Sequence, residues 1–203
     1  MGDFALDRAK MMSIAFGSDR PPIRSRLKLY LLSSELHCVA AYRFGRYAAE
    51  LRARRGAMAI PLIVVHRLWN RWNTHIHHCD IDRTAVIGPG LLLMHRQGII
   101  IGPVVLGVNS VIHHNVTIGQ RVAAADQGVP HIGDDVWIGT GAILVGAITV
   151  GSGATISAGS VVSRDVPERS LVAGNPGRVI ATDYDNSTMI NFAMPGAQAR
   201  HTS

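Results

Sequence analysis

A repeat of six residues runs from Ile132 to Pro167, and it limits what this chain can fold into more than any other feature. Each of its six blocks opens with an aliphatic residue: Ile132, Ile138, Leu144, Val150, Ile156 and Val162. An amphipathic helix needs apolar residues every three or four positions and a half-buried strand every two, so this period fits neither. It predicts a parallel β-helix in which each block is a short strand and a turn, three blocks close a triangular coil, and the opening residues stack as buried ladders. An irregular glycine-rich segment would not keep its phase through the six blocks.

The same repeat begins earlier in the chain. Its first aliphatic positions are Ile81, Ile87 and Leu93. The phase then slips by one residue near positions 99–102 and resumes at Ile100, with six-residue steps to Ile118. The repeat stops before Ile132, so we expect residues 120–131 to leave the coil as an extruded loop. Loops that interrupt a rigid scaffold often carry substrate contacts.

Two helices are predicted before the repeat. Between residues 32 and 51, apolar residues recur at three- and four-residue steps. Ser33 or Ser34 can cap the start of this helix, and Gly56 can end it. A second helix is expected after Pro61, because proline suits the first helical turn.

The 203-residue chain therefore divides into three parts. We expect an α-helical region in residues 1–73, a β-helix in residues 74–180, and a tail in residues 181–203 that lacks a strong pattern and is loosely ordered. Residues 1–30 have weak periodicity and are assigned no helix. The fold class is mainly β, with a small α-helical region before the β-helix and an extruded loop within it.

Positive charge is concentrated in the first third of the chain. Between Arg20 and Trp72, eleven Lys and Arg residues stand against Glu35 and Glu50, a balance of +9; the whole chain carries +6, so the remainder carries −3. Such a region can attract nucleic acid, anionic lipid or a phosphorylated ligand. No nucleic-acid motif accompanies it, so the sequence favours a solvated helical face over nucleic acid and over a membrane surface.

The two cysteines, Cys38 and Cys79, give no disulfide framework, which favours a reducing cytoplasm. Charged residues interrupt the apolar residues near the N-terminus, so no signal peptide is expected. The longest apolar run, residues 57–65, contains a proline and is too short to span a bilayer. We expect a cytoplasmic protein.

Three histidines lie beside Cys79 just before the repeat, at His75, His77 and His78. These residue types bind zinc. Successive residues of a strand point to opposite faces, however, so the four side chains cannot all converge on one ion. We expect no metal site here.

Several segments together resemble the hexapeptide-repeat acyltransferases, and among them the serine O-acetyltransferase-like branch. These segments are Asp80-Ile81-Asp82, Gly90–His95 with Gly98 after it, Asn115–Gly119, the repeat itself, and Ala173–Arg178. The resemblance covers residues 74–180. It implies a left-handed β-helix, acetyl-CoA as co-substrate, a small-molecule hydroxyl acceptor, and a homotrimer, with pairing of two trimers left open.

The resemblance implies that His95 is the general base, which takes the proton of the acceptor hydroxyl as its oxygen attacks the thioester directly. Imidazole suits this role because its unperturbed pKa lies near neutrality. The same resemblance places an orienting carboxylate at Asp80. Spacing agrees independently, since Asp80 lies fifteen residues before His95, close to one three-block coil. Neither cysteine matches a nucleophile position, so no acyl-enzyme is expected.

The family binds CoA in the groove between neighbouring β-helices of a trimer, largely through backbone groups beside small residues. The matching positions in this chain are Gly119, Thr140, Ala158 and Gly159. Small side chains there let the pantetheine arm approach the backbone. Arg178 is placed to bind the CoA phosphates through its charge and forked donors.

The chain departs from the serine enzymes where they hold the acceptor. Those enzymes carry an acidic residue immediately before the base, where this chain has Met94. They also carry Arg-His before the proline that follows the loop, where this chain has Gly128-Val129 before Pro130. The missing groups are those that hold the ammonium and carboxylate of an amino acid.

Three other residues are candidates to bind the acceptor. Arg121 and His131 belong to the expected loop, and His114 is in phase with His95. Two acceptors stay open. Serine would place the protein in cysteine biosynthesis, whereas a sugar hydroxyl would match the polysaccharide-modifying relatives of this branch.

Two alternative functions are compatible with the same predicted fold. Some trimeric left-handed β-helices of the carbonic anhydrase type bind zinc through three histidines, and His95, His113 and His131 are each eighteen residues apart. They do not share a face, because His95 comes two places after its ladder residue, His113 one place after and His131 one before. A non-catalytic scaffold would leave the spacing of Asp80 and His95 unexplained. The sequence therefore predicts an O-acetyltransferase without a metal ion.

Overall fold

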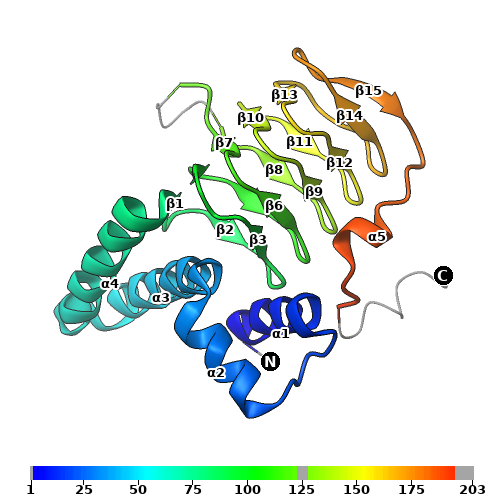
Figure 1. Cartoon of the computed structure of the whole chain (residues 1–203). Coiled ribbons are helices and arrows are strands. Elements are labelled where there is room, and N and C mark those ends of the chain that lie inside the picture. Colours follow the sequence, from blue (N-terminus) through cyan, green and yellow to red (C-terminus); the bar gives the residue numbers. More distant parts are fainter. Residues whose placement is uncertain (1, 123–127, 195–203) are drawn as a thin grey trace.

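The structure, a computed structural model, describes residues 2–122 and 128–194 and contains a three-sided parallel β-helix with a helical region at its first coil (Figure 1). Strands from successive coils pair in register along each side. The predicted fold class, mainly β with a left-handed β-helix after an α-helical region, is confirmed.

Each side of the β-helix is one sheet. The first sheet contains β1 (Cys79–Ile81), β4 (Ile99–Ile101), β7 (Thr117–Gly119), β10 (Ile143–Val145) and β13 (Val161–Val162). The second contains β2 (Val86–Ile87), β5 (Val105–Leu106), β8 (His131–Ile132) and β11 (Thr149–Val150). The third contains β3 (Leu92–Met94), β6 (Val111–His113), β9 (Trp137–Ile138), β12 (Thr155–Ile156), β14 (Leu171–Ala173) and β15 (Arg178–Ala181).

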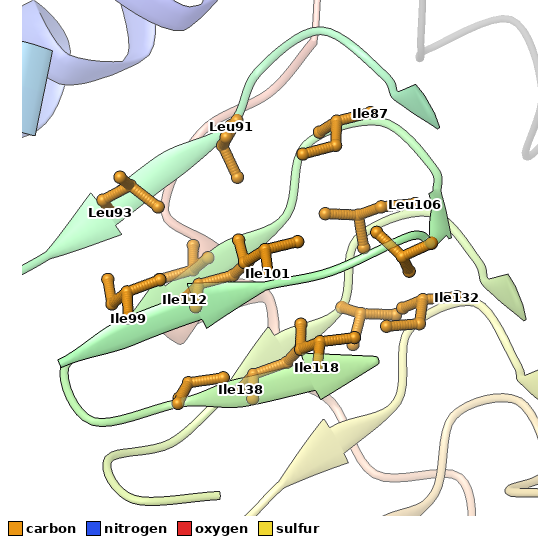
Figure 2. Packing of buried hydrophobic residues seen from close by; sticks show 14 of the residues in the cluster. Ile87, Leu91, Leu93, Ile99, Ile101, Leu106, Ile112, Ile118, Ile132 and Ile138 are labelled. Atoms are coloured by element: carbon orange, nitrogen blue, oxygen red, sulfur yellow. The ribbon is translucent and has the colours of Figure 1, made fainter. Parts of the chain in front are cut away.

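The core of the β-helix is made of aliphatic ladders. On the first sheet the ladder passes through Ile81, Ile101, Ile118, Leu144 and Val162, which are all buried. Figure 2 shows that the labelled aliphatic residues of the first coils point inward from all three sides. Burial of one such side chain contributes about 1.5–3 kcal/mol, so the repeat stabilises the same core at every coil.

One expected ladder position is wrong. Ile100 is 54% exposed, whereas Ile99 and Ile101 on either side are 0% and 1% exposed. Ile101 pairs with Ile81 in one direction and with Ile118 in the other, so the inward position of β4 falls on Ile101. Because side chains alternate along a strand, Ile100 must then point outward.

The chain leaves the coil between β7 and β8, as the break in the repeat predicted. Twenty-six residues separate Leu106 from its partner Ile132 in the next coil, against eighteen between Ile132 and Val150. Strand β8 begins at His131, so this residue belongs to the sheet and not to the loop. The predicted loop contains residues 123–127, which lie outside the described residues.

The two predicted helices are present as α3 (Ser34–Arg55) and α4 (Ile60–Trp72), joined by a 3₁₀ turn (Gly56–Ala59). Ser33 caps α3 by accepting the amide of Leu36 at 3.2 Å, and Gly56 ends it with a φ of 57°. A π turn (Asn73–His77) leads from α4 into β1. Within the described residues, no helix is long and apolar enough to cross a bilayer.

The sequence missed α1 (Asp3–Phe16) and α2 (Ile23–Leu32). The cause in α1 is that charged residues occupy buried positions. The Lys10 amine donates to the carbonyl and side-chain oxygens of Asn109 at 2.9 and 2.8 Å. The Asp7 carboxylate accepts the amide of Gly90 at 2.8 Å and the guanidinium of Arg43 at 2.8 Å. These buried groups bind α1 to the first coils, and removal of one partner would leave a buried charge unpaired.

The described part of the tail returns to the β-helix. β15 pairs antiparallel with β14, and α5 (Ser187–Ile190) follows. The Asn186 side chain donates to the carbonyl of Asp135 at 2.8 Å, and the Asn109 side chain donates to the carbonyl of Phe192 at 2.9 Å. Residues 181–194 therefore make specific contacts, in contrast to the loose order that we expected from their sequence.

The ladder assignment predicts unequal costs for two neighbouring substitutions. Ile101→Ala should lower the free energy of unfolding by about 2–5 kcal/mol, because it opens a cavity in the core. Ile100→Ala should change it by no more than about 0.5 kcal/mol, because the side chain is exposed. Urea unfolding of both variants measures this, and equal losses would contradict the observed register.

Lys10 predicts a specific pH dependence of stability. Burial lowers the pKa of Lys10 to about 7, although the negative charges of Asp135 and Asp7 act to raise it. The pKa of a lysine in the unfolded chain is about 10.4. Between these values the unfolded chain binds a proton that the folded chain does not. The group therefore makes the free energy of unfolding rise with pH over this window, by up to about 1.4 kcal/mol per pH unit. Urea unfolding at several pH values should show this slope in the wild type and a flatter one in Lys10→Met; identical slopes would contradict the assignment.

Candidate functional site

One longitudinal edge of the β-helix gathers predicted site residues from four consecutive coils. It is the edge where the chain turns from the third sheet to the first. Met94 pairs with His113, so His95 and His114 follow at the same place in neighbouring coils. The pairing of β6 with β9 and of β9 with β12 places Thr140 and then Ala158 at this position in the next two coils. We call the line of His95, His114, Thr140 and Ala158 the site edge.

The rings of His95 and His114 contact each other edge to face. Their centroids are 5.9 Å apart and their planes meet at 73°, so the predicted phase relation between them is confirmed. His95 is exposed and has a φ of 56°, a left-handed conformation that is uncommon outside glycine. Nδ1 of His114 is buried and has no hydrogen-bond partner among the described residues. The exposed imidazole of His95 therefore lies directly beside a partly buried one.

The next histidine, His113, lies against an aromatic ring and not at the site edge. Its ring centroid is 4.8 Å from that of Trp137. Burial lowers the pKa of His113, and the neighbouring His114 and His95 lower it further. His131 lies in β8 on the second sheet. The histidines at 95, 113 and 131 therefore do not share a face, as the ladder phase predicted.

The small residues expected to bind CoA lie partly along the same edge. The amide of Gly159 donates to the carbonyl of Thr140 at 2.8 Å, which joins two coils beside Ala158. Gly159 has a φ of 68°, which glycine adopts without strain, and a Cβ placed there would meet no atom within 4 Å. This corner is consequently open enough for a ligand to approach the backbone.

Gly119 and Arg178 lie apart from these residues within one chain. Gly119 ends β7 and pairs with Val145, at the opposite end of the first sheet from the site edge. Arg178 begins β15 and lines a cavity of about 100 Å³ in the last coil, together with Arg164 and Asp165. Both arginines can offer guanidinium groups to an anion there.

Asp80 and His95 are not hydrogen bonded to each other among the described residues. Asp80 is exposed at the middle of β1 and pairs with Ile100 in the next coil. Its carboxylate accepts a hydrogen bond of 3.3 Å from the side chain of Asn70 in α4. It also lines a cavity of about 430 Å³ between α4 and the first coil, with Arg67 and Arg71 on the helix side. The orienting role of Asp80 stays a prediction.

The loop candidate Arg121 and the departures from the serine enzymes can also be placed. Arg121 lies just after β7, and its Nε would be 3.9 Å from a Cβ at Gly146 in the next coil. Met94 is partly buried and packs against the aliphatic core. The carbonyl of Gly128 accepts the side-chain amide of Gln120 at 3.1 Å. Position 94 therefore holds an apolar side chain that supports the core directly before the predicted base.

The four residues that resembled a metal cluster do not come together. The thiols of Cys79 and Cys38 are hydrogen bonded and buried, and this bond together with burial raises the pKa of Cys79. His75 is exposed, while burial and then Arg96 lower the pKa of His77. Across residues 2–122 and 128–194, no group of three or more His, Cys, Asp or Glu side chains is arranged to hold a metal ion.

Sequence reasoning missed two residues at these positions. Asn70 holds the Asp80 carboxylate, but only the packing of α4 on β1 reveals the contact. Trp137 packs against His113. The second could have been found, because Trp137 is the one aromatic residue in the sequence from Ile132 to Pro167.

Comparisons with known proteins agree on one class. Residues 130–164 match the family described as bacterial transferase hexapeptide (six repeats). The chain is 37% identical over 170 residues to a serine acetyltransferase of Bacillus licheniformis, a match that covers 83% of this chain and 74% of the relative. It is 34% identical over 147 residues to serine acetyltransferase 4 of Arabidopsis thaliana, with 66% of this chain and 41% of that longer relative covered.

A solved structure shows the same arrangement. The serine acetyltransferase of Brucella abortus strain S19, crystallised in complex with coenzyme A, superposes with a TM-score of 0.72 and 26% sequence identity. The superposition covers 89% of this chain and 68% of the other. The similarity therefore extends beyond the repeat and into the helical region.

Proposed function

Because the chain belongs to the serine acetyltransferase family of hexapeptide-repeat transferases, we propose that it transfers the acetyl group of acetyl-CoA to the hydroxyl oxygen of a small acceptor, with serine as the first candidate. The observation that carries the proposal is the site edge, which aligns an exposed imidazole with an open, small-residue corner three coils away. A relative of the same fold binds coenzyme A.

His95 is the general base in this proposal. Its imidazole takes the proton of the acceptor hydroxyl while that oxygen forms a bond to the thioester carbonyl carbon. The carbon–sulfur bond then breaks, and the imidazolium returns the proton to the thiolate of CoA. Transfer is direct, since the two cysteines are buried and hydrogen bonded to each other. The exposure of His95 leaves its ring accessible to both substrates.

His114 and Asp80 position this base. The edge-to-face contact of His114 restricts the ring of His95 from one side. Asp80 is proposed to accept the remaining ring N–H of His95, which would fix the tautomer. The carboxylate would then hydrogen bond to His95 instead of Asn70. Because Asp80 is exposed, this change of partner costs little free energy.

CoA is proposed to lie along the site edge, in the groove between two β-helices of a homotrimer. Thr140, Ala158 and Gly159 would line the pantetheine arm in one subunit. Gly119 and Arg178 are distant from this line within a chain, so they are proposed to contact CoA from other parts of the same groove. The guanidinium of Arg178 suits the CoA phosphates.

The acceptor site differs from that implied for serine enzymes at Met94 and Gly128-Val129. Charged hydrogen bonds of the missing type are each worth about 1.5–3 kcal/mol. Arg121 and His131 are the proposed replacements. Within one chain they lie away from the site edge, just after β7 and in β8, so they would reach the acceptor from a neighbouring β-helix across the groove. A sugar hydroxyl is the second candidate acceptor because it needs neither an ammonium nor a carboxylate site. Acetylation of serine would place the protein in cysteine biosynthesis, and a cytoplasmic location belongs to the same proposal.

Replacement of the base tests the mechanism. His95→Ala should lower kcat by about a hundredfold or more, the usual contribution of general base catalysis, while binding of CoA measured by calorimetry stays unchanged. Glu168→Ala, which truncates an exposed side chain where the chain turns from the second sheet to the third, is the control and should keep full activity. Turnover of His95→Ala at the wild-type rate would remove His95 from the role of base.

The acceptor is tested by following the release of free thiol from acetyl-CoA with serine and with a panel of sugars. We expect saturable release with serine at a KM above about 1 mM, the upper end of the common range, because the ammonium and carboxylate contacts are reduced. Release of thiol with sugars alone would show that the acceptor is a sugar hydroxyl and not serine. No binding of CoA to the protein would contradict the proposed transfer itself.

A further inference from the structure

Helix α2 exposes a row of large apolar side chains. Ile23, Leu27 and Leu31 follow one another at four-residue steps and are between 56% and 72% exposed. Residues four apart on a helix differ by roughly 40° in direction, so the three lie on one face. No residue of α2 is buried, although Leu29 and Tyr30 pack partly against the core.

Helix α4 repeats this arrangement. Ile60, Val64, Leu68 and Trp72 also follow at four-residue steps and are between 45% and 65% exposed. His66 is the buried residue of α4, and it lies on the other side of the helix from Val64 and Leu68. In Figure 1, α4 lies at the outer margin of the helical region, and its C-terminal end adjoins β1. These faces are exposed in the single chain, and a soluble protein rarely leaves apolar faces of this extent uncovered.

Each apolar row has basic residues beside it. Arg24 and Lys28 follow Ile23 and Leu27 by one position on α2, and both are exposed. Arg67 and Arg71 are likewise exposed beside the row of α4, and they also line the cavity that contains Asp80. Residues 20–72 carry +9 in total. Basic residues next to an apolar face are the pattern of helices that lie in the surface of an anionic bilayer.

We propose that the exposed faces of α2 and α4 bind an anionic lipid surface. The apolar rows enter the boundary between headgroups and acyl chains, and the neighbouring cations contact lipid phosphates. Trp72 ends the row of α4, and its amphipathic ring suits this interface. The sequence alone favoured a solvated face over a membrane surface. The exposure of the apolar rows in the structure is the reason for the change.

Charge favours lipid over a second copy of this chain. Two copies that met through these helices would bring two strongly basic surfaces together, which costs free energy. An anionic bilayer supplies the opposite charge. Each row also forms the convex face of a single helix. Such a face fits a fluid lipid surface, whereas a protein partner would need a complementary groove. This inference does not depend on the proposed acetyl transfer, because vesicle binding is measured without acetyl-CoA.

Vesicle flotation of the full chain tests the proposal. Vesicles of phosphatidylcholine mixed with phosphatidylglycerol should carry the protein, and vesicles of phosphatidylcholine alone should not. Val64→Ser/Leu68→Ser and Leu27→Ser/Leu31→Ser should each weaken the binding, and Arg67→Gln/Arg71→Gln should weaken it by about thirtyfold, with greater effect at low salt. The control is Val179→Ser/Ile180→Ser, which removes exposed apolar side chains from β15 and should bind as the wild type.

Light scattering on the same variants decides between lipid and a second copy. The proposal expects an unchanged oligomeric state in all of them. It is overturned if the anionic vesicles do not bind the wild type, or if the helix variants bind as well as the control does. It is also overturned if the helix substitutions break the assembly into smaller species, since the faces would then be contacts between copies.

Discussion

The structure depends on the stacking of one aliphatic side chain directly above the next from coil to coil. Ile112, Ile138 and Ile156 illustrate this on the third sheet, where each pairs with the next and is completely buried. A side chain displaced by one residue would point to solvent, since directions alternate along a strand. The ladder therefore fixes the register of every coil. It also fixes the place of each corner residue that follows a strand.

The site edge is a consequence of that register. His95 and His114 meet because the strands before them pair residue for residue, and Thr140 occupies the equivalent corner one coil further on. A rigid scaffold of this kind can hold the proposed base and the proposed CoA-binding corner at a constant separation without a dedicated hydrogen-bond network. The excursion between β7 and β8 lengthens the connection without disturbing the ladder, because Leu106 still pairs with Ile132.

The sequence predicted the parts whose pattern is local. The six-residue period identified the β-helix, and the cap at Ser33 located the start of α3. It could not predict α1, because Lys10 is buried against Asn109, ninety-nine residues later, and such a partner is invisible in the pattern. Ile100 was misplaced because the pairing of β4 with two other coils decides which side chain points inward. The contact between Asp80 and Asn70 likewise needs the packing of α4.

The most direct test of the account is a crystal structure of the protein with CoA bound. The account predicts that the pantetheine arm lies along the site edge against Thr140 and Ala158, with its sulfur beside the ring of His95. It also predicts that a neighbouring β-helix closes the other side of the groove. CoA bound on another face of the β-helix, with the imidazole of His95 exposed to solvent and distant from the sulfur, would contradict the central claim.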